Sequence, residues 1–365
     1  MSSAPSRFLQ NAPTQSGTPD NRALALQMFS GLVLEAFQNK TVFYDNTGNI
    51  IQHKMLSGSH SAQFPIMGTD IDLSAAASGT GATKGYHEAG TFLAGSTVLM
   101  GKTSIEVDDI LVGSMDIGFA DLDIAHFDVL GPFAMKLGRS LATDCDKKIC
   151  TIGIKAARTA AVSGLHAGGN QVTRSVGAAA TALATAYANN DTGSGYFRDD
   201  VASLARSMDE DNVPEDGRYL FISPYIRAIL RHETAIFNRD LSDGSVVGSI
   251  NNRVLGQLEG FNLIMTNAIP TATVSGYSGY AAKYNQVVGV AAGATAAGEE
   301  RCAAVALCGA VGGSAAVGMV QASGIRSVIQ DDERRNTKFM KSQMMVGFGV
   351  LAPWCAGTID ITRTA

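Results

Sequence analysis

One long amphipathic segment, residues 121–157, constrains the fold of this chain more than any other stretch, and we expect its helix to run from Asp128 to Ala157. Apolar side chains recur along it at spacings of three and four residues, at Phe127, Leu130, Ala134, Leu137, Leu141, Cys145, Ile149 and Ile152. This spacing predicts a helix with a single apolar stripe. Asp128 is a good N-cap, and Pro132 falls in the first turn, where its missing N–H costs little. At 1.5 Å per residue the helix would be about 45 Å long, a length that suits a spine along which other layers pack.

The opposite face of this helix carries charged side chains. They are Lys136, Arg139, Asp144, Asp146, Lys147, Lys148 and Lys155. We interpret them as solvated surface, because exposed ion pairs are common and contribute little stability. Contact with a neighbouring subunit is the alternative.

Composition excludes several classes of protein. The chain has 365 residues, of which 45% are hydrophobic and 17% are charged, so it can bury a large core and form two or three domains. Its formal net charge of -5 provides no basic field for wrapping nucleic acid, and contact with DNA should be weak and indirect. We expect a cytosolic protein without membrane contact, because there is no signal pattern and no apolar run of about eighteen residues.

The five cysteines give no metal-ligand spacing and no obvious pairing. They are Cys145, Cys150, Cys302, Cys308 and Cys355. An odd number of widely spaced cysteines in a cytosolic protein predicts reduced and mostly buried thiols.

The first third of the chain predicts extended structure around one helix. Residues 1–21 have little to bury and predict an arm, and residues 22–39 predict a helix of about four turns. Extended segments are expected at residues 41–44, 50–56 and 57–68, with Pro65 at an unpaired edge. The Ala/Gly/Ser/Thr-rich residues 74–101 are too long for a loop in a compact domain. We interpret them as a projecting two-stranded arm, with residues 103–117 as the returning strand.

The last two thirds predict a sheet covered by helices. The predicted strands are residues 218–222, 260–266, 287–290, 301–307 and 358–361, and the predicted helices are residues 197–208 and a segment that starts at Ser223-Pro224. Residues 178–188 have weak helical character within a Gly/Ala-rich stretch. The strand, helix, strand order describes an α+β or α/β domain.

One string approaches a nucleotide-binding motif. Gly101-Lys102-Thr103 ends a stretch that begins at Gly95, as in a phosphate-binding P-loop. The P-loop needs four residues between its glycines, so that successive amides curl around a phosphate before a helix begins. Here five residues intervene, and the sequence after Thr103 alternates like a strand. A P-loop-like nucleotide-binding enzyme therefore remains an alternative with an imperfect motif.

Other titratable residues do not form a recognisable catalytic site. The six histidines are scattered, and we interpret each as a surface or packing residue. The carboxylates occur in runs, which favours solvated faces and ion pairs over an acid/base couple. These runs lie at residues 108–109, 199–200, 209–211 and 331–333. We expect no catalytic residue, cofactor or metal.

Several short strings occur in an order that resembles the major capsid proteins of tailed phages. Phe29-Ser30-Gly31, and residues 61–65 (SAQFP) with Gly68, are similar to the arm and hairpin start of short-tailed, autographivirus-like (podovirus) phages. Residues 121–123 (DLD), residues 126–129 (HFDV) and Leu137-Gly138 are similar to the start of their spine helix. The match continues in order through Val213-Pro214, Gly260-Phe261 and Arg334-Arg335-Asn336.

The resemblance implies the HK97-like capsid fold, which is of the α+β class. It implies an N-terminal arm and short helix over residues 1–40, and an extended β-hairpin, the E-loop, over residues 41–103. A peripheral domain with the spine helix would comprise residues 104–160 and 310–365, and an axial α/β domain would comprise residues 161–309. The Ala/Gly-rich hairpin tip and residues 164–195 depart from the family pattern. No motif matches the covalent crosslink of one branch, so no crosslinking residue is assigned.

The resemblance also implies a function and partners. The protein would be a major capsid protein that self-assembles into pentamers and hexamers of an icosahedral shell around double-stranded DNA, without binding a specific DNA sequence. Its partners would be copies of itself, a scaffolding protein, a portal and, in some phages, a cement or decoration protein. It would assemble in the host cytoplasm and reside in the virion. An encapsulin-type nanocompartment shell of the same fold is the first alternative.

Physical reasoning suggests where copies of the chain would meet. A projecting hairpin cannot bury its apolar side chains in its own body, so we expect a neighbour's spine to cover them. Charged side chains on the spine and in the return segment would fix the register between subunits. The predicted inter-subunit contacts are Phe64, Phe92, Leu93, Lys136, Arg139, Arg334 and Arg335.

Overall fold

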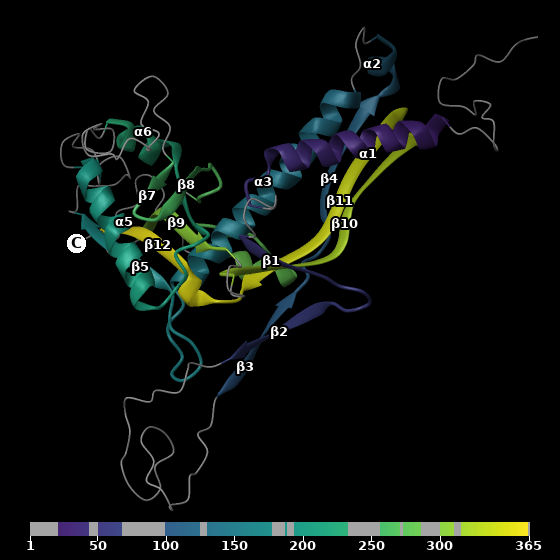
Figure 1. The fold of residues 1–365 in the computed structure, drawn as a ribbon. Coiled ribbons are helices and arrows are strands. Elements are labelled where there is room, and N and C mark those ends of the chain that lie inside the picture. Colours follow the sequence, from purple (N-terminus) through teal and green to yellow (C-terminus); the bar gives the residue numbers. More distant parts are fainter. Residues whose placement is uncertain are drawn as a thin grey trace, which may run out of the picture.

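Figure 1 shows an elongated molecule in which helix α3 (Leu130–Ala157) runs between two sheets. A six-stranded sheet with α5 and α6 lies at one end, a four-stranded sheet with α1 and α2 lies at the other, and hairpin β2–β3 projects away from both (Figure 1). The computed structural model describes residues 21–43, 50–67, 99–124, 130–176, 187, 193–232, 256–270, 273–285, 300–309 and 315–363.

Helix α3 confirms the predicted spine from its first described residue onward. Its buried side chains include the predicted stripe members Ala134, Leu137, Leu141, Cys145, Ile149 and Ile152. Lys136, Arg139, Lys147 and Lys155 are exposed, as interpreted. The solvated interpretation is wrong for Asp146 and Lys148, which are buried because other elements cover the middle of the helix on several sides.

Helix α1 (Asn21–Lys40) crosses α3 at close range, and it confirms the helix predicted at residues 22–39. The crossing depends on Gly138, where an added Cβ would lie 2.9 Å from the Ala36 Cβ and 3.1 Å from the Phe37 backbone nitrogen. Where α1 ends, the Thr41 hydroxyl donates to Asp146 Oδ1 at 2.8 Å, and the Val42 N–H donates to Oδ2 at 3.0 Å. Residues 41–43 therefore form a bend held by α3, and the extended segment predicted at residues 41–44 is wrong for these three residues, whereas Tyr44 lies outside the described residues.

A long hairpin dominates the four-stranded sheet. The strand order is β1 (Ile51–Met55), β10 (Val317–Asp332), β11 (Thr337–Val350) and β4 (Leu111–Gly118), and β4 continues into α2 (Phe119–Ile124). Strands β10 and β11 are antiparallel, and β1 joins β10 in parallel. The sequence pattern did not predict this hairpin, because register shifts between Gln321 and Arg326 interrupt the alternation of inward and outward residues.

The six-stranded sheet confirms the strands predicted near residues 218–222, 260–266, 301–307 and 358–361. Its order is β5 (Asn170–Val176), β12 (Ala356–Arg363), β9 (Glu300–Cys308), β6 (Arg218–Ile222), β8 (Phe261–Met265) and β7 (Gln257–Leu258). Helices α5 (Gly193–Glu210) and α6 (Pro224–His232) accompany it, and the Ser223 hydroxyl caps α6 by accepting from the Ile226 N–H at 3.4 Å. The segments predicted at residues 178–188 and 287–290 lie outside the described residues, except for Tyr187.

Two predicted boundaries need correction. Strand β12 lies between β5 and β9, so the end of the segment 310–365 belongs to the six-stranded sheet and not to the sheet that holds β10 and β11. Residues 103–117 are not one returning strand, since β3 (Met100–Glu106) pairs with β2 (Ser61–Met67) while β4 pairs with β11. Pro65 lies opposite Lys102 in this two-stranded sheet, which confirms its predicted place on an edge strand.

Candidate functional site

The structure gives no support to the nucleotide-binding alternative. Gly101, Lys102 and Thr103 lie within β3 and pair with Ile66, Pro65 and Phe64 of β2. A P-loop needs these amides curled around a phosphate at a helix N-terminus, so this motif is not a P-loop. Within the described residues, no group of three or more His, Cys, Asp or Glu side chains could hold a metal ion.

No helix in the described part of the chain is long and apolar enough to cross a bilayer. All five cysteines are unpaired and buried, which confirms the predicted buried thiols. Burial raises the pKa of the Cys145, Cys150 and Cys302 thiols, so these sulfur atoms remain protonated and unreactive at neutral pH.

The base of the projecting hairpin is the feature of the fold that most needs explanation. Its inner face forms an apolar cluster with the four-stranded sheet, made of Ala62, Phe64, Ile105, Val107, Val320 and Leu351. The Phe64 side chain is only 7% exposed. The expectation that Phe64 needs a neighbouring subunit to cover it is therefore wrong, because β10 and the residue after β11 already do so.

Three glycines let the hairpin base lie directly on the sheet. Gly318 and Gly349 are paired across β10 and β11, and an added Cβ would lie 2.8 Å and 2.7 Å, respectively, from Ile105 side-chain carbons. At Gly347 the added Cβ would lie 2.9 Å from the Val107 Cα and would overlap the Glu106 carbonyl oxygen. Any side chain at these positions would push the hairpin off the sheet.

A buried ionic group lies where the chain leaves β3, and we call Asp108, Lys148, Lys283 and Tyr284 the joint cluster. The Tyr284 hydroxyl donates to Asp108 Oδ2 at 2.6 Å, and Lys283 Nζ lies 2.7 Å from Asp108 Oδ1. Lys148 Nζ lies 4.0 Å from Asp108 Oδ2 and 3.1 Å from Asp144 Oδ2. The cluster joins the β3–β4 connection to α3 and to the short helix η1 (Gly279–Tyr284).

Burial dominates the electrostatics of this cluster. It raises the pKa of the Asp108 carboxyl, although hydrogen bonds from Lys283 and Tyr284 oppose the shift. Burial and the neighbouring Asp108 carboxylate both raise the pKa of Tyr284, so its hydroxyl stays a donor. We interpret the acidic runs as solvated faces and ion pairs, and Asp108 is of the second kind, since it is buried and paired with Lys283. Asp200 is also buried and ion-paired, and it accepts from Arg174 Nε at 2.6 Å.

A second contact holds the far end of the hairpin base. The loop of residues 161–168, which we call the brace loop, follows α3 and is closed by the Val162 N–H donating to the His166 carbonyl at 3.0 Å. It lies against β3, since an added Cβ at Gly101 would lie 2.9 Å from Leu165 Cδ1, and one at Gly164 would lie 2.9 Å from Leu99 Cδ1. Three apolar side chains remain exposed here: Leu99 at 56%, Met100 at 69% and Val162 at 48%.

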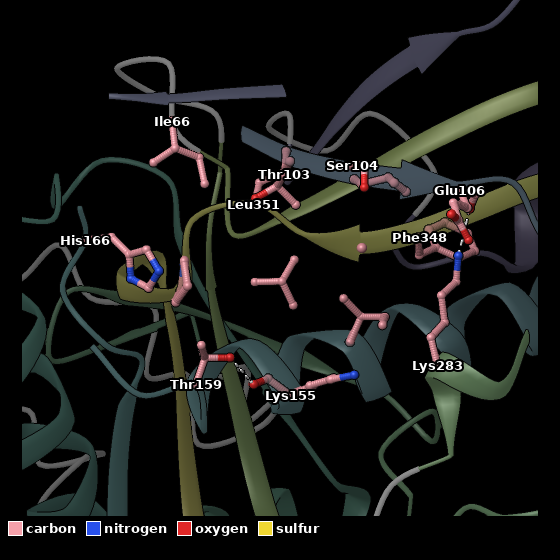
Figure 2. Close-up of a pocket in the computed structure, with 15 residues that line it drawn as sticks. Ile66, Thr103, Ser104, Glu106, Lys155, Thr159, His166, Lys283, Phe348 and Leu351 are labelled. Atoms are coloured by element: carbon pink, nitrogen blue, oxygen red, sulfur yellow. Dashed lines mark hydrogen bonds between the residues drawn. The ribbon is translucent and has the colours of Figure 1, made fainter. Parts of the chain in front are cut away.

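A hollow of about 390 Å³ separates the two contacts. Figure 2 shows Thr103 and Ser104 of β3 on one side and Lys155 and Thr159 near the end of α3 on the other. His166 of the brace loop lies at one end of the hollow. At the other end Lys283 donates to the Glu106 carbonyl at 2.8 Å (Figure 2). The hairpin base thus spans the hollow between two supports.

The remaining predicted contact residues are distributed over one end of the molecule. Lys136 and Arg139 are exposed on the first half of α3, and Arg334 and Arg335 are exposed in the turn between β10 and β11. Both segments lie at the end that carries α2 (Figure 1). Phe92 and Leu93 lie outside the described residues.

The sequence analysis did not predict the joint cluster, although the position of one member, Lys148, indicates that its side chain is buried. Lys148 follows Cys145 by three residues and precedes Ile152 by four, so it occupies a position in the apolar stripe of α3. A charged residue at such a position is expected to be buried and paired. Asp108 gave no comparable signal, because it stands beside exposed Asp109 in a run of two acids.

The fold matches those of solved phage capsid subunits. The capsid structure of cyanophage P-SCSP1u matches 100% of this chain and 100% of its own, with 25% sequence identity and a TM-score of 0.71. The mature capsid of bacteriophage PhiM1 matches 88% of this chain and 87% of its own, with 17% identity and a TM-score of 0.66. A virus-like particle from Pyrococcus furiosus shares the fold at 10% identity and a TM-score of 0.50, covering 92% of this chain and 99% of its own. The molecule is therefore a capsid subunit with the expected α+β, HK97-like fold.

The family is equally clear. The chain belongs to the Gp10A-like family of major capsid proteins, whose family model matches residues 78–360. No curated protein matches the sequence. The predicted identity as the major capsid protein of a tailed phage is confirmed, and the protein is a structural, shell-forming component of the virion.

Proposed function

We propose that this chain forms the pentamers and hexamers of an icosahedral head that encloses double-stranded DNA. Assembly takes place in the host cytoplasm, around a scaffolding protein and a portal, and a cement or decoration protein can join the finished shell. The phage would be of the short-tailed, podovirus type. The observation that carries the proposal is the family match over residues 78–360, together with the full-length likeness to the cyanophage capsid.

The exposed surface of the hairpin base supports assembly with other copies. Leu99 and Met100 on the hairpin, and Val162 on the brace loop that lies against it, expose apolar side chains. Clustered apolar exposure of this kind is typical of an interaction surface. We propose that a neighbouring subunit covers these three side chains, and that Phe92 and Leu93 extend the same contact.

Charged residues at the opposite end support a second contact. Lys136, Arg139, Arg334 and Arg335 have exposed side chains on two neighbouring elements. Exposed charges of this kind steer association and fix register, and they add little to affinity. The net charge of -5 fits a shell that encloses DNA without binding any particular sequence.

The division into structural units also stays a proposal. Residues 1–40 form the arm and short helix, and residues 41–103 form the E-loop with its base strands. Residues 104–160 and 310–355 form the peripheral domain around α3, whereas residues 161–309 form the axial domain. We assign residues 356–363 to the axial domain as well, and the pairing of β12 with β5 and β9 supports this assignment.

Negative-stain electron microscopy of the purified protein tests the proposed function. The expected result is uniform hollow particles when the chain is produced with a scaffolding protein. A monomer at every protein and salt concentration tested would contradict it. An encapsulin-type nanocompartment shares the fold, so the contents decide between the two: packaged double-stranded DNA supports a phage head, and a cargo enzyme supports a nanocompartment.

A pair of substitutions at Met100 localises the contact. Met100→Leu keeps the apolar surface and should assemble like the native chain. Met100→Gln replaces it with a polar group of similar length, and burying an apolar side chain of this size stabilises by about 1.5–3 kcal/mol. We therefore expect the Gln variant to need a subunit concentration at least about tenfold higher for assembly. Equal assembly of both variants would exclude Met100 from the interface.

A further inference from the structure

Two short connections of the chain join the projecting hairpin to the body. One links β1 to β2 through residues 56–60, and the other links β3 to β4 through residues 107–110. The Val107 N–H donates to the His60 carbonyl at 3.0 Å, so the two connections are themselves tied together. We call residues 56–60 and 107–110 the hairpin crossing. The contacts that hold this crossing, together with the apolar cluster under the hairpin base, set the direction of the hairpin relative to α3.

The crossing completes an open edge of strand β11. Strand β4 pairs with β11 only as far as Leu111, which lies opposite Met344. Beyond that point the Asp108 N–H donates to the Val346 carbonyl at 3.2 Å, and the Phe348 N–H donates to the Tyr284 hydroxyl at 3.1 Å. Backbone groups on this edge are thus satisfied by Asp108 and by its hydrogen-bonding partner Tyr284.

The Asp108 side chain connects the crossing to two further elements. It is only 3% exposed, and its two oxygens contact Lys283 and Tyr284 of η1 at 2.7 Å and 2.6 Å. Lys148 brings α3 to the same carboxylate at 4.0 Å, and its ammonium also lies 5.3 Å from the centre of the Tyr284 ring. Lys283 bridges back to the hairpin by donating to the Glu106 carbonyl at 2.8 Å.

We infer that Asp108 is the positioning residue that fixes the direction of the projecting hairpin relative to helix α3. Without its carboxylate, Lys148 and Lys283 lose a shared buried counter-charge, and the contact between η1 and the crossing is lost. The brace loop and the apolar cluster under the hairpin base would then be the remaining supports. The hairpin would pivot on these supports, while the body of the subunit keeps its own core.

The consequence for assembly rests on the proposed function. Each copy must present its hairpin to a neighbour at nearly the same angle, because small angular errors accumulate around a closed shell. A subunit with a loosely held hairpin would still fold and still associate. It would close into shells of mixed size or leave open sheets.

The direct test measures the hairpin in the full-length, unassembled subunit. Spin labels on Gln63→Cys in β2 and Ser140→Cys in α3 report the distance between hairpin and spine, since both positions are exposed and all five native cysteines are buried. Pulsed electron paramagnetic resonance should give one narrow distance distribution for the native background. Asp108→Asn should broaden or shift that distribution.

Two further variants keep the test decisive. Lys283→Met removes a partly exposed member of the joint cluster and should broaden the distribution even if Asp108→Asn does not fold. Asp109→Asn makes the same charge change at the next residue, which is exposed, and should leave the distribution unchanged. A native distribution in folded Asp108→Asn or Lys283→Met would overturn the inference, and so would equal broadening by Asp109→Asn.

Particle assembly separates this inference from the proposed function. If the native chain forms uniform particles, Asp108→Asn should form particles of mixed size or open sheets, while Asp109→Asn forms particles of native size. Uniform native-sized particles from Asp108→Asn would overturn the inference. If the native chain forms no particles, the proposed function fails, and the label distances still decide whether Asp108 holds the hairpin.

Discussion

The close crossing of α1 over α3 predicts that replacing glycine by alanine will have opposite effects on the stability of the subunit at Gly138 and at Gly31. Gly138 of α3 lies beneath α1, where an added Cβ would be 2.9 Å from the Ala36 Cβ and 3.1 Å from the Phe37 nitrogen. Gly31 lies in α1 itself, and an added Cβ there would meet nothing within 4 Å. Gly138→Ala and Gly31→Ala are therefore a matched pair that differs in the space available.

The expected magnitudes follow from two opposing terms. Alanine stabilises a helix interior by about 1 kcal/mol relative to glycine, and this term applies to both variants. Overpacking costs about 1–3 kcal/mol, and it applies only to Gly138→Ala. We expect the upper end of that range, because the atoms in the way include backbone atoms of α1, which cannot rotate aside. Gly31→Ala should thus gain about 1 kcal/mol and Gly138→Ala should lose about 2 kcal/mol.

Urea unfolding of the unassembled subunit, followed by far-ultraviolet circular dichroism, measures both values under one set of conditions. The difference between the variants removes the shared helix term and leaves the contact penalty, about 3 kcal/mol. A stabilised Gly138→Ala variant would refute the argument, because it would mean that α1 does not lie against α3 at this point. Loss of stability in Gly31→Ala would equally show that its position is not open.

Three further predictions concern buried polar groups. Asp360→Asn should lower the free energy of unfolding by about 3 kcal/mol. The substitution removes the negative charge that accepts from Arg158 Nε at 2.9 Å and from Gln171 Nε2 at 2.7 Å. A loss below about 1 kcal/mol in urea unfolding would contradict this prediction. Burial raises the pKa of Asp108 above 3.8, so the folded chain binds this proton more tightly than the unfolded chain. That stabilisation is present below the unfolded pKa and is lost as pH rises through the folded pKa. The stability of the native subunit relative to Asp108→Asn should therefore fall as pH rises above about 4, the pKa of an unfolded aspartate, and a rise would reverse the assigned sign. The five buried cysteines should not react with a thiol-specific reagent until the subunit unfolds, and rapid modification of the folded subunit would contradict their burial.

Much of the fold was predictable because its longest elements carry regular local signals. The stripe of α3 repeats through the helix, and Ser223-Pro224 marks the start of α6. Strand β6 is a short apolar run with clear ends. In each case the residues that define the element are close to one another in sequence. The element can therefore be predicted without knowing which other elements pack against it.

The long hairpin and the joint cluster depend on partners that are distant in sequence. Strand β10 changes register twice along β11, and each shift breaks the alternation that predicts a strand. The burial of Asp108 depends on Tyr284, which lies 176 residues away. Phe64 is buried because the hairpin base packs on β10, and this packing needs Gly318 and Gly349, which leave space for the Ile105 side chain. No local pattern identifies such contacts, although the charged residue in the stripe of α3 indicates that one exists.

The place of β12 in its sheet has a consequence for biosynthesis. Strand β12 lies between β5 and β9, yet it is translated after every other strand of the sheet. A nascent chain that has emerged only through β11 therefore has a gap between β5 and β9, with unpaired backbone on both sides of it. Completion of this sheet therefore waits until β12 has been synthesised and can enter between β5 and β9.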